Sequence, residues 1–156
     1  MGALVKGIDH VAMTVPDVEK ATQFLEEAFD AKTILDWHAP KGSAVSGPGA
    51  ERVFGMPSGG RWDQRRMLQV GSSVVELFHY EVSGQRDAAR TVDYGITHMA
   101  LLVDDVQEAA RRFESAGGKL FAAHNTLDGR VDPETAWVYG RTPWGAVVEL
   151  VGFPAQ

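Results

Sequence analysis

Residues 8–21 read I-D-H-V-A-M-T-V-P-D-V-E-K-A, and residues 96–109 read I-T-H-M-A-L-L-V-D-D-V-Q-E-A. The two stretches lie 88 residues apart and share isoleucine, histidine, alanine, valine and aspartate at matching places. A second pair follows, with S-V-V-E-L-F at 73–78 and A-V-V-E-L-V at 146–151. An internal repeat is typical of a fold built from copies of one unit. We therefore expect two halves that each supply one histidine and one glutamate.

Apolar periodicity assigns the same order of elements to both halves. It predicts strands at 4–15, 32–37, 65–70 and 72–80, then at 95–103, 119–123, 136–140 and 146–152. A helix follows the first strand of each half, beginning at the expected N-cap Asp17 in one and spanning 105–116 in the other. Each half is thus β-α-β-β-β, and because one such half cannot bury both faces of its sheet, two must pair.

The composition limits the classes of protein. At 156 residues with 44% hydrophobic content, the chain has the size of one domain, expected to span 1–156 as a module at about 4–81, a polar linker at 82–93 and a module at 94–153. The absence of cysteine excludes disulfides and thiolate metal sites. A net charge of −6 argues against nucleic acid as a partner. The start M-G-A-L-V-K-G does not resemble a signal peptide and no apolar run is long enough to span a membrane, so a cytoplasmic location is expected.

The repeated glutamates stand in strands that are apolar on both faces. Alternation puts Glu76 on one face with Val74 and Phe78, and Glu149 has equivalent neighbours. No lysine or arginine lies within four residues of either glutamate. A buried carboxylate requires a cation, a metal or a proton. A single such residue is most often solvated or satisfied in the core, but a His–Glu pair that occurs in both halves favours metal ligands, namely His10, Glu76, His98 and Glu149. Two imidazoles and two carboxylates make a neutral site with a divalent ion and leave about two coordination positions open.

Residues outside the repeated motifs are candidates for a substrate pocket. The apolar candidates are Phe54, Met56, Trp62 and Trp137, and Arg66 could meet an anionic substrate. Phe54 and Trp62 lie at the end of a Gly- and Pro-rich segment, 38–63, and are expected to form a lid. Core packing is the competing interpretation for Trp137, and a solvated surface role is the competing one for Arg66. His79 should point away from Glu76 and have a structural or surface role.

These residues and motifs resemble the vicinal oxygen chelate superfamily, which includes glyoxalase I, methylmalonyl-CoA epimerase, extradiol dioxygenases and the fosfomycin- and bleomycin-resistance proteins. The resemblance covers about residues 5–152 and depends on D-H-V-A-M-T-V-P-D at 9–17, H-M-A-L-L-V-D-D at 98–105, A-G-G-K at 116–119 and P-W-G-A-V-V-E-L at 143–150. It implies an α+β fold in which two βαβββ modules pair into a cupped eight-stranded mixed sheet with a metal in the cup. The order His–Glu–His–Glu matches the glyoxalase I type best.

The expected function is that of a divalent-metal-dependent isomerase or lyase that transfers a proton next to a carbonyl of a small organic substrate. Glu149 is the first candidate for the base and Glu76 the second. One ion of Ni, Co, Zn, Mn or Fe per site is expected, and the family resemblance implies a homodimer. Two alternatives stay open: an Fe(II) extradiol-type dioxygenase, which needs only three ligands, and a metal-free protein that binds a small molecule such as a drug.

Overall fold

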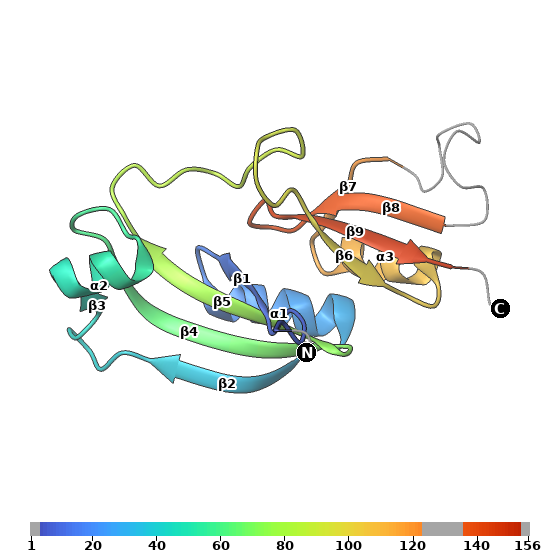
Figure 1. The fold of residues 1–156 in the computed structure, drawn as a ribbon. Coiled ribbons are helices and arrows are strands. Elements are labelled where there is room, and N and C mark those ends of the chain that lie inside the picture. The colour runs from blue at the N-terminus through green and yellow to red at the C-terminus, as the bar shows by residue number, and fades with distance from the viewer. Residues whose placement is uncertain (1–3, 123–135, 154–156) are drawn as a thin grey trace. The chain divides into compact units, whose positions relative to one another are not determined.

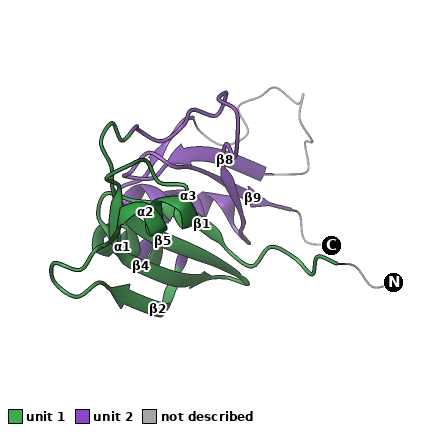
Figure 2. Ribbon diagram, turned by 60° about the vertical axis from the view of Figure 1, so that its left-hand side comes forward, with its two compact units in different colours: residues 1–26, 30–85 green, residues 27–29, 86–156 purple. Residues whose placement is uncertain are grey.

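The computed structural model describes residues 4–122 and 136–153. Its contacts divide the chain into two compact units, residues 1–26 with 30–85 and residues 27–29 with 86–156 (Figure 2). In the first unit the elements are β1 (Val11–Thr14), α1 (Val18–Phe29), β2 (Lys32–His38), β3 (Val45–Ser46), α2 (Gly47–Phe54), β4 (Arg61–Val70) and β5 (Ser73–Glu81). In the second they are β6 (Met99–Leu102), α3 (Val106–Ser115), β7 (Lys119–Leu120), β8 (Ala136–Arg141) and β9 (Val147–Gly152).

Each unit contains its own mixed sheet (Figure 1). The first has the order β1-β5-β4-β2, with β3 added beside β4, and the second has the order β6-β9-β8-β7. The predicted α+β class and the repeated β-α-β-β-β order are therefore confirmed. The short strand β3 and helix α2 are additional in the first unit, so the described residues form two sheets of five and four strands where eight strands in one sheet were expected.

The strand register repeats along with the sequence. Strand β1 runs parallel to β5 and places Ala12 opposite Glu76, while β6 runs parallel to β9 and places Ala100 opposite Glu149. In both units the histidine lies two residues before that alanine. The predicted first strands, 4–15 and 95–103, are shorter in the structure because only their last residues pair with a neighbour.

Helix α1 begins where the sequence predicts. The Asp17 side chain accepts a hydrogen bond from the Lys20 backbone N–H, which satisfies one of the free donors at the helix start. The helix ends at Asp30, whose φ of 54° is left-handed. One stripe of α1 is fully buried, including Val18, Ala21 and Leu25. This apolar stripe covers one face of the sheet and leaves the other face available for a site.

Helix α3 packs against its sheet through a tight aromatic contact. The Phe113 side chain is buried, and a Cβ atom placed on Gly118 or Gly140 would lie 2.3 or 2.6 Å from its ring. Only glycine leaves room for the ring at these two positions. The A-G-G-K motif is therefore explained by packing as well as by the end of the helix.

The Gly- and Pro-rich segment 38–63 contains more structure than the sequence suggests. It forms β3 and α2, and α2 ends at Gly55 with a left-handed φ of 64°. Trp62, expected in a lid, instead lies inside β4 and is only 7% exposed. The predicted strand began only at residue 65. A β-bulge between Trp62 and Gln64 interrupts the alternation of apolar and polar residues, so the sequence pattern does not show the start of β4.

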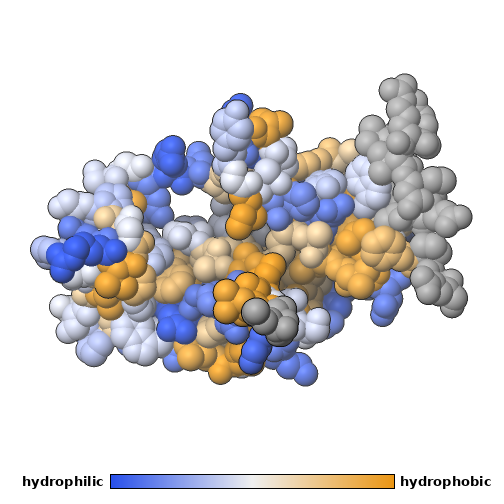
Figure 3. Space-filling view, viewed as in Figure 1, coloured by the Kyte–Doolittle hydropathy of each residue, from blue (hydrophilic) through white to orange (hydrophobic). Residues whose placement is uncertain are grey.

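No helix in the two described stretches is long and apolar enough to cross a membrane. Apolar side chains do remain at the surface, as the orange residues of Figure 3 illustrate. Ile8 and Ile96, which occupy equivalent positions ahead of β1 and β6, are 87% and 85% exposed within the chain.

Candidate functional site

The first His–Glu pair lies on the face of the first sheet opposite α1. Glu76 stands in the middle of β5, and its Oε2 atom is 3.1 Å from the Nε2 atom of His10, which immediately precedes β1. The Glu76 side chain is only 7% exposed and the His10 side chain 37%. The predicted pair is therefore brought together, with the glutamate buried and the histidine partly exposed.

The second unit repeats this geometry. The Nε2 atom of His98 is 3.1 Å from Oε2 of Glu149, and their side chains are 32% and 17% exposed. The two pairs belong to different units. The agreement between them shows that the sequence repeat preserves a contact as well as a fold.

The other nitrogen of each imidazole also has a partner. His10 Nδ1 lies 2.7 Å from Asp9 Oδ2, and His98 Nδ1 lies 2.9 Å from Thr97 Oγ1. Both nitrogens of His10 face carboxylate oxygens, which only accept, so Nε2 can meet Glu76 directly only by donating a proton. With its proton on Nδ1, directed at Asp9, the ring would have its Nε2 lone pair available for a metal. A metal-binding histidine is typically oriented through its second nitrogen in this way.

The donor set fits a divalent ion. Two atoms bonded to one ion at about 2.1 Å and at right angles lie roughly 3.0 Å apart. Each imidazole nitrogen and its carboxylate oxygen are 3.1 Å apart, which is compatible with neighbouring ligands. Imidazole and carboxylate ligands suit Mn, Fe, Co, Ni and Zn.

Arg65 of β4 is a partner of Glu76 that the sequence did not reveal. Its Nε atom lies 2.5 Å from Glu76 Oε1, a close ion pair without the alignment of a directed hydrogen bond. No lysine or arginine lies within four residues of Glu76 in the sequence, yet the fold supplies one of the partners that a buried carboxylate requires. Strand pairing brings the arginine in, because Arg65 lies opposite Phe78, two residues from Glu76.

Tyr139 of β8 is the corresponding unpredicted partner in the second unit. It lies directly opposite Glu149 on the neighbouring strand. Burial, hydrogen bonding to the Glu149 carboxylate and the charge of that group raise the pKa of Tyr139, so its hydroxyl remains protonated and can donate to the carboxylate. The turn centred on Trp144 could have indicated this pairing, because Tyr139 and Glu149 are equally distant from it.

A cluster of aromatic residues lies further along β5, where Phe78 and Tyr80 share a sheet face with Glu76. Trp62 contacts Trp37, Phe54, Phe78 and Tyr80, with ring centroids 5.0, 5.5, 5.3 and 6.5 Å away. Burial and the negative charge of Glu76 raise the pKa of Tyr80. Of the pocket residues predicted from this segment, Phe54 and Trp62 thus join one cluster. Met56 is half-buried in the turn after α2.

Trp137 stands beside the second pair. By strand alternation it shares a sheet face with Tyr139 and Glu149, and its ring centroid is 5.8 Å from that of Tyr139. The Tyr139 ring also meets the His98 ring edge-on, with centroids 5.2 Å apart. Each carboxylate therefore shares its sheet face with aromatic residues.

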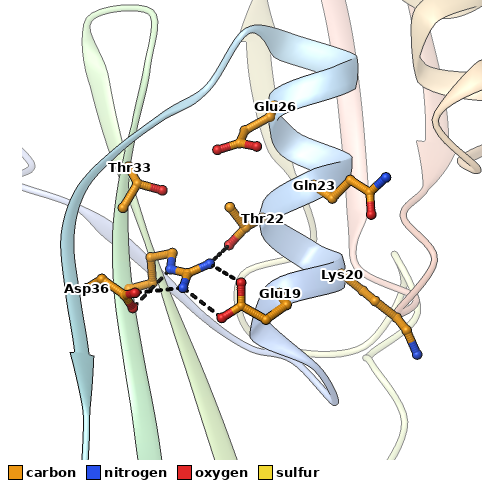
Figure 4. A pocket seen from close by; sticks show the side chains of 8 residues that line it. Glu19, Lys20, Thr22, Gln23, Glu26, Thr33 and Asp36 are labelled. Atoms are coloured by element: carbon orange, nitrogen blue, oxygen red, sulfur yellow. Dashed lines mark hydrogen bonds and ion pairs between the residues drawn. The ribbon is translucent and has the colours of Figure 1, made fainter.

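Arg66 lies on the opposite face of the first sheet from Glu76. Its guanidinium binds Glu19 and Asp36 in a bidentate manner, at 2.7 to 3.0 Å, and also donates to Thr22 (Figure 4). The residues of this network line a pocket of about 460 Å³. Because the hydrogen bonds of Arg66 are already made to α1 and β2, its role is to hold these elements together, and the structure does not bring it to the Glu76 face.

Replacing Arg66 with methionine is expected to lower the free energy of unfolding at pH 7 by about 2 kcal/mol. This is less than the cost of breaking a fully buried pair, because Glu19 and Asp36 are 64% and 38% exposed and can be rehydrated. Arg66→Lys keeps the charge but loses the planar geometry, so its free energy of unfolding should lie between those of wild type and Arg66→Met. Urea unfolding measures the effect.

The same network should make stability depend on pH. Hydrogen bonds from Arg66 lower the pKa values of Glu19 and Asp36 in the folded protein. Their contribution is therefore present above about pH 5 and lost as the pH falls through the folded-state values. The difference between wild type and Arg66→Met should shrink by pH 3, and an unchanged difference would contradict this account.

A second cluster of possible ligands lies at the far end of the first sheet. One atom each of Asp63, His79 and Glu81 falls within 4.8 Å of the others. His79 already pairs with Asp63 at 2.8 Å and Glu81 with Arg61 at 2.5 Å, so these groups satisfy one another. His79 lies on the opposite face from Glu76.

Comparisons with known proteins show what the chain resembles in sequence and in fold. The family model of the Glyoxalase/Bleomycin resistance protein/Dioxygenase superfamily matches residues 7–150. A 2-epi-5-epi-valiolone epimerase from Actinomyces sp is 32% identical over 95% of this chain and 80% of its own length. The crystal structure of a glyoxalase family protein from Bacillus cereus is 20% identical, covers 98% of this chain and 97% of its own, and has a TM-score of 0.74. A fosfomycin resistance protein from Listeria monocytogenes, complexed with Mn(II) and sulfate, is 16% identical over 96% of this chain and 93% of its own, with a TM-score of 0.61.

Proposed function

The chain belongs to the glyoxalase/bleomycin resistance protein/dioxygenase superfamily, and we propose that it is a divalent-metal-dependent epimerase. The observation that carries the proposal is the repeated His–Glu pair, with the same 3.1 Å separation in both units. The predicted superfamily is confirmed. The sequence-based expectation named glyoxalase-type and epimerase-type activity together, and the 32% identical relative favours the epimerase.

The proposed substrate is a small ketone. The support is the name of the 32% identical relative, a 2-epi-5-epi-valiolone epimerase. Inverting a carbon next to a ketone carbonyl requires removing its proton and adding one to the opposite face. Aromatic residues beside Glu76 and Glu149 suit this chemistry, because they exclude water and strengthen electrostatic interactions.

His10, Glu76, His98 and Glu149 would hold the ion. When bound, a divalent ion supplies a Lewis acid that stabilises negative charge on the substrate oxygen. We assign Glu149 as the base that removes the proton and Glu76 as the second candidate, as their places in the repeat suggest. Asp9 and Thr97 orient the two imidazoles. We also expect a homodimer, since twofold oligomers are the commonest.

The test is hydrogen exchange with solvent. The protein is incubated in D2O with 2-epi-5-epi-valiolone and Mn(II), Co(II), Ni(II) or Zn(II), and NMR follows deuterium entry and the change of configuration. We expect both to occur with at least one metal and to stop after chelation. A parallel incubation without protein corrects for spontaneous exchange.

The same experiment separates the two alternatives. Oxygen consumption with a catechol and Fe(II), without exchange into the ketone, would instead favour a dioxygenase. Ligand binding with neither exchange nor oxygen uptake, whatever the metal, would favour a binding protein.

A further inference from the structure

The two halves repeat the His–Glu pair but not the third group that touches each carboxylate. In the first unit this group is Arg65, while Met67 lies opposite Glu76. In the second unit Tyr139 lies opposite Glu149, and Trp137 occupies the position equivalent to Arg65. The two His–Glu pairs therefore have the same geometry, but the residue beside the carboxylate is a cation in the first unit and a neutral hydroxyl in the second.

The two carboxylate oxygens of Glu76 have different partners. Oε2 faces the His10 ring at 3.1 Å, and Oε1 meets Arg65 Nε at 2.5 Å. The guanidinium is itself held, since its NH2 group lies 3.4 Å from the Met67 sulfur. Glu76 is buried while Arg65 is 36% exposed, so removing the arginine would leave the buried carboxylate without this cation. Glu76 is thus fixed with one oxygen on the imidazole side.

Tyr139 supports Glu149 less strongly. A neutral hydroxyl forms a weaker bond to a carboxylate than a guanidinium does. The Glu149 side chain is also more exposed, at 17% against 7% for Glu76. The Tyr139 ring itself is held between His98 and Trp137, with centroids 5.2 and 5.8 Å away. The hydroxyl therefore has a fixed position, while the carboxylate it supports retains more freedom.

We propose that Arg65 and Tyr139 are positioning residues that give the two carboxylates unequal tasks. Arg65 anchors Glu76 as a stationary ligand, and Tyr139 directs Glu149 toward the carbon that loses its proton. In that step the C–H bond breaks, the proton passes to Glu149, and the electron pair moves to the carbonyl oxygen. Water returns a proton to the opposite face of the carbon, and Glu149 releases its own to water. The assignment of Glu149 rests on the proposed function.

The test compares Arg65→Met with Tyr139→Phe in two measurements. Mn(II) affinity is measured by calorimetry, and kcat and KM for 2-epi-5-epi-valiolone are measured with saturating metal. Arg65→Met should weaken Mn(II) binding by about 10–100-fold, the range for groups that orient metal ligands. Tyr139→Phe should leave Mn(II) affinity within about threefold and lower kcat by about tenfold, with KM little changed. Arg65→Lys, which restores the charge without the planar geometry, should recover part of the affinity.

Other results overturn the inference. Equal losses of Mn(II) affinity in Arg65→Met and Tyr139→Phe would mean that both groups support ligands alike, and no change in either would mean that neither positions a carboxylate. If circular dichroism shows that Arg65→Met does not fold, the Mn(II) affinity of Arg65→Lys is compared with wild type instead. An affinity equal to that of wild type would then contradict the role of Arg65. Wild-type protein that binds Mn(II) but does not turn over the ketone would refute the proposed function, while the affinity comparison would still test Arg65.

Discussion

Replacing Glu149 with glutamine is expected to lower kcat for proton transfer by about 10²–10⁴-fold, the usual contribution of a general base. Glutamine has nearly the same shape and keeps an oxygen that can accept from Tyr139, so the fold should be preserved. The amide cannot take a proton from carbon. Solvent deuterium exchange measures the loss directly, because it reports proton removal even when no product accumulates.

Two variants serve as comparisons for Glu149→Gln. Glu114→Gln changes an exposed glutamate of α3 in the same unit and should retain full exchange. Glu76→Gln should act mainly through metal affinity, since Glu76 is anchored by Arg65. Full turnover and normal metal content in both Glu149→Gln and Glu76→Gln would exclude the carboxylates from the mechanism.

Removing both histidines is expected to abolish metal binding. The His10→Ala/His98→Ala double variant takes one nitrogen ligand from each pair, and the remaining carboxylates offer a hard, oxygen-only set that binds transition metals weakly. We expect about one ion per chain in wild-type protein prepared without a histidine tag, and almost none in the variant. Elemental analysis after dialysis measures the content.

His38→Ala is the matched control for the double variant. His38 is an exposed histidine of β2 that contacts Asp36, away from Glu76, so its loss should not affect metal content. An ion retained by the double variant would place the metal elsewhere, with Asp63, His79 and Glu81 the first residues to mutate. Wild-type protein without metal even after reconstitution would favour the metal-free binding protein.

The local features of the fold were readable from the sequence. Asp17 caps α1 as predicted, since capping depends on residues within one turn. The hairpin around Gly71 also forms, with φ of 55° at that glycine. The segment 38–63 was harder, because short elements such as α2 depend on the strands beside them more than on their own pattern.

The sequence likewise predicts some features of the candidate site and not others. The repeat identified His10, Glu76, His98 and Glu149, and the structure brings each histidine beside the glutamate of its own half. Nothing in the sequence distinguished Arg66 from a solvated surface arginine. In the structure it is only 6% exposed and joins α1 to β2. Sequence patterns do not show such contacts, because the partners lie 30 and 47 residues away.

The sequence by itself determined the repeated β-α-β-β-β order and the residues that the two halves share, because periodicity and self-similarity are properties of the chain alone. Tertiary structure decided which groups complete each pair. Arg65 reaches Glu76 and Tyr139 reaches Glu149 only after neighbouring strands pair, since pairing sets which residues from distant parts of the chain face one another. The two halves are alike in sequence around their ligands and differ in the groups that strand pairing brings to them.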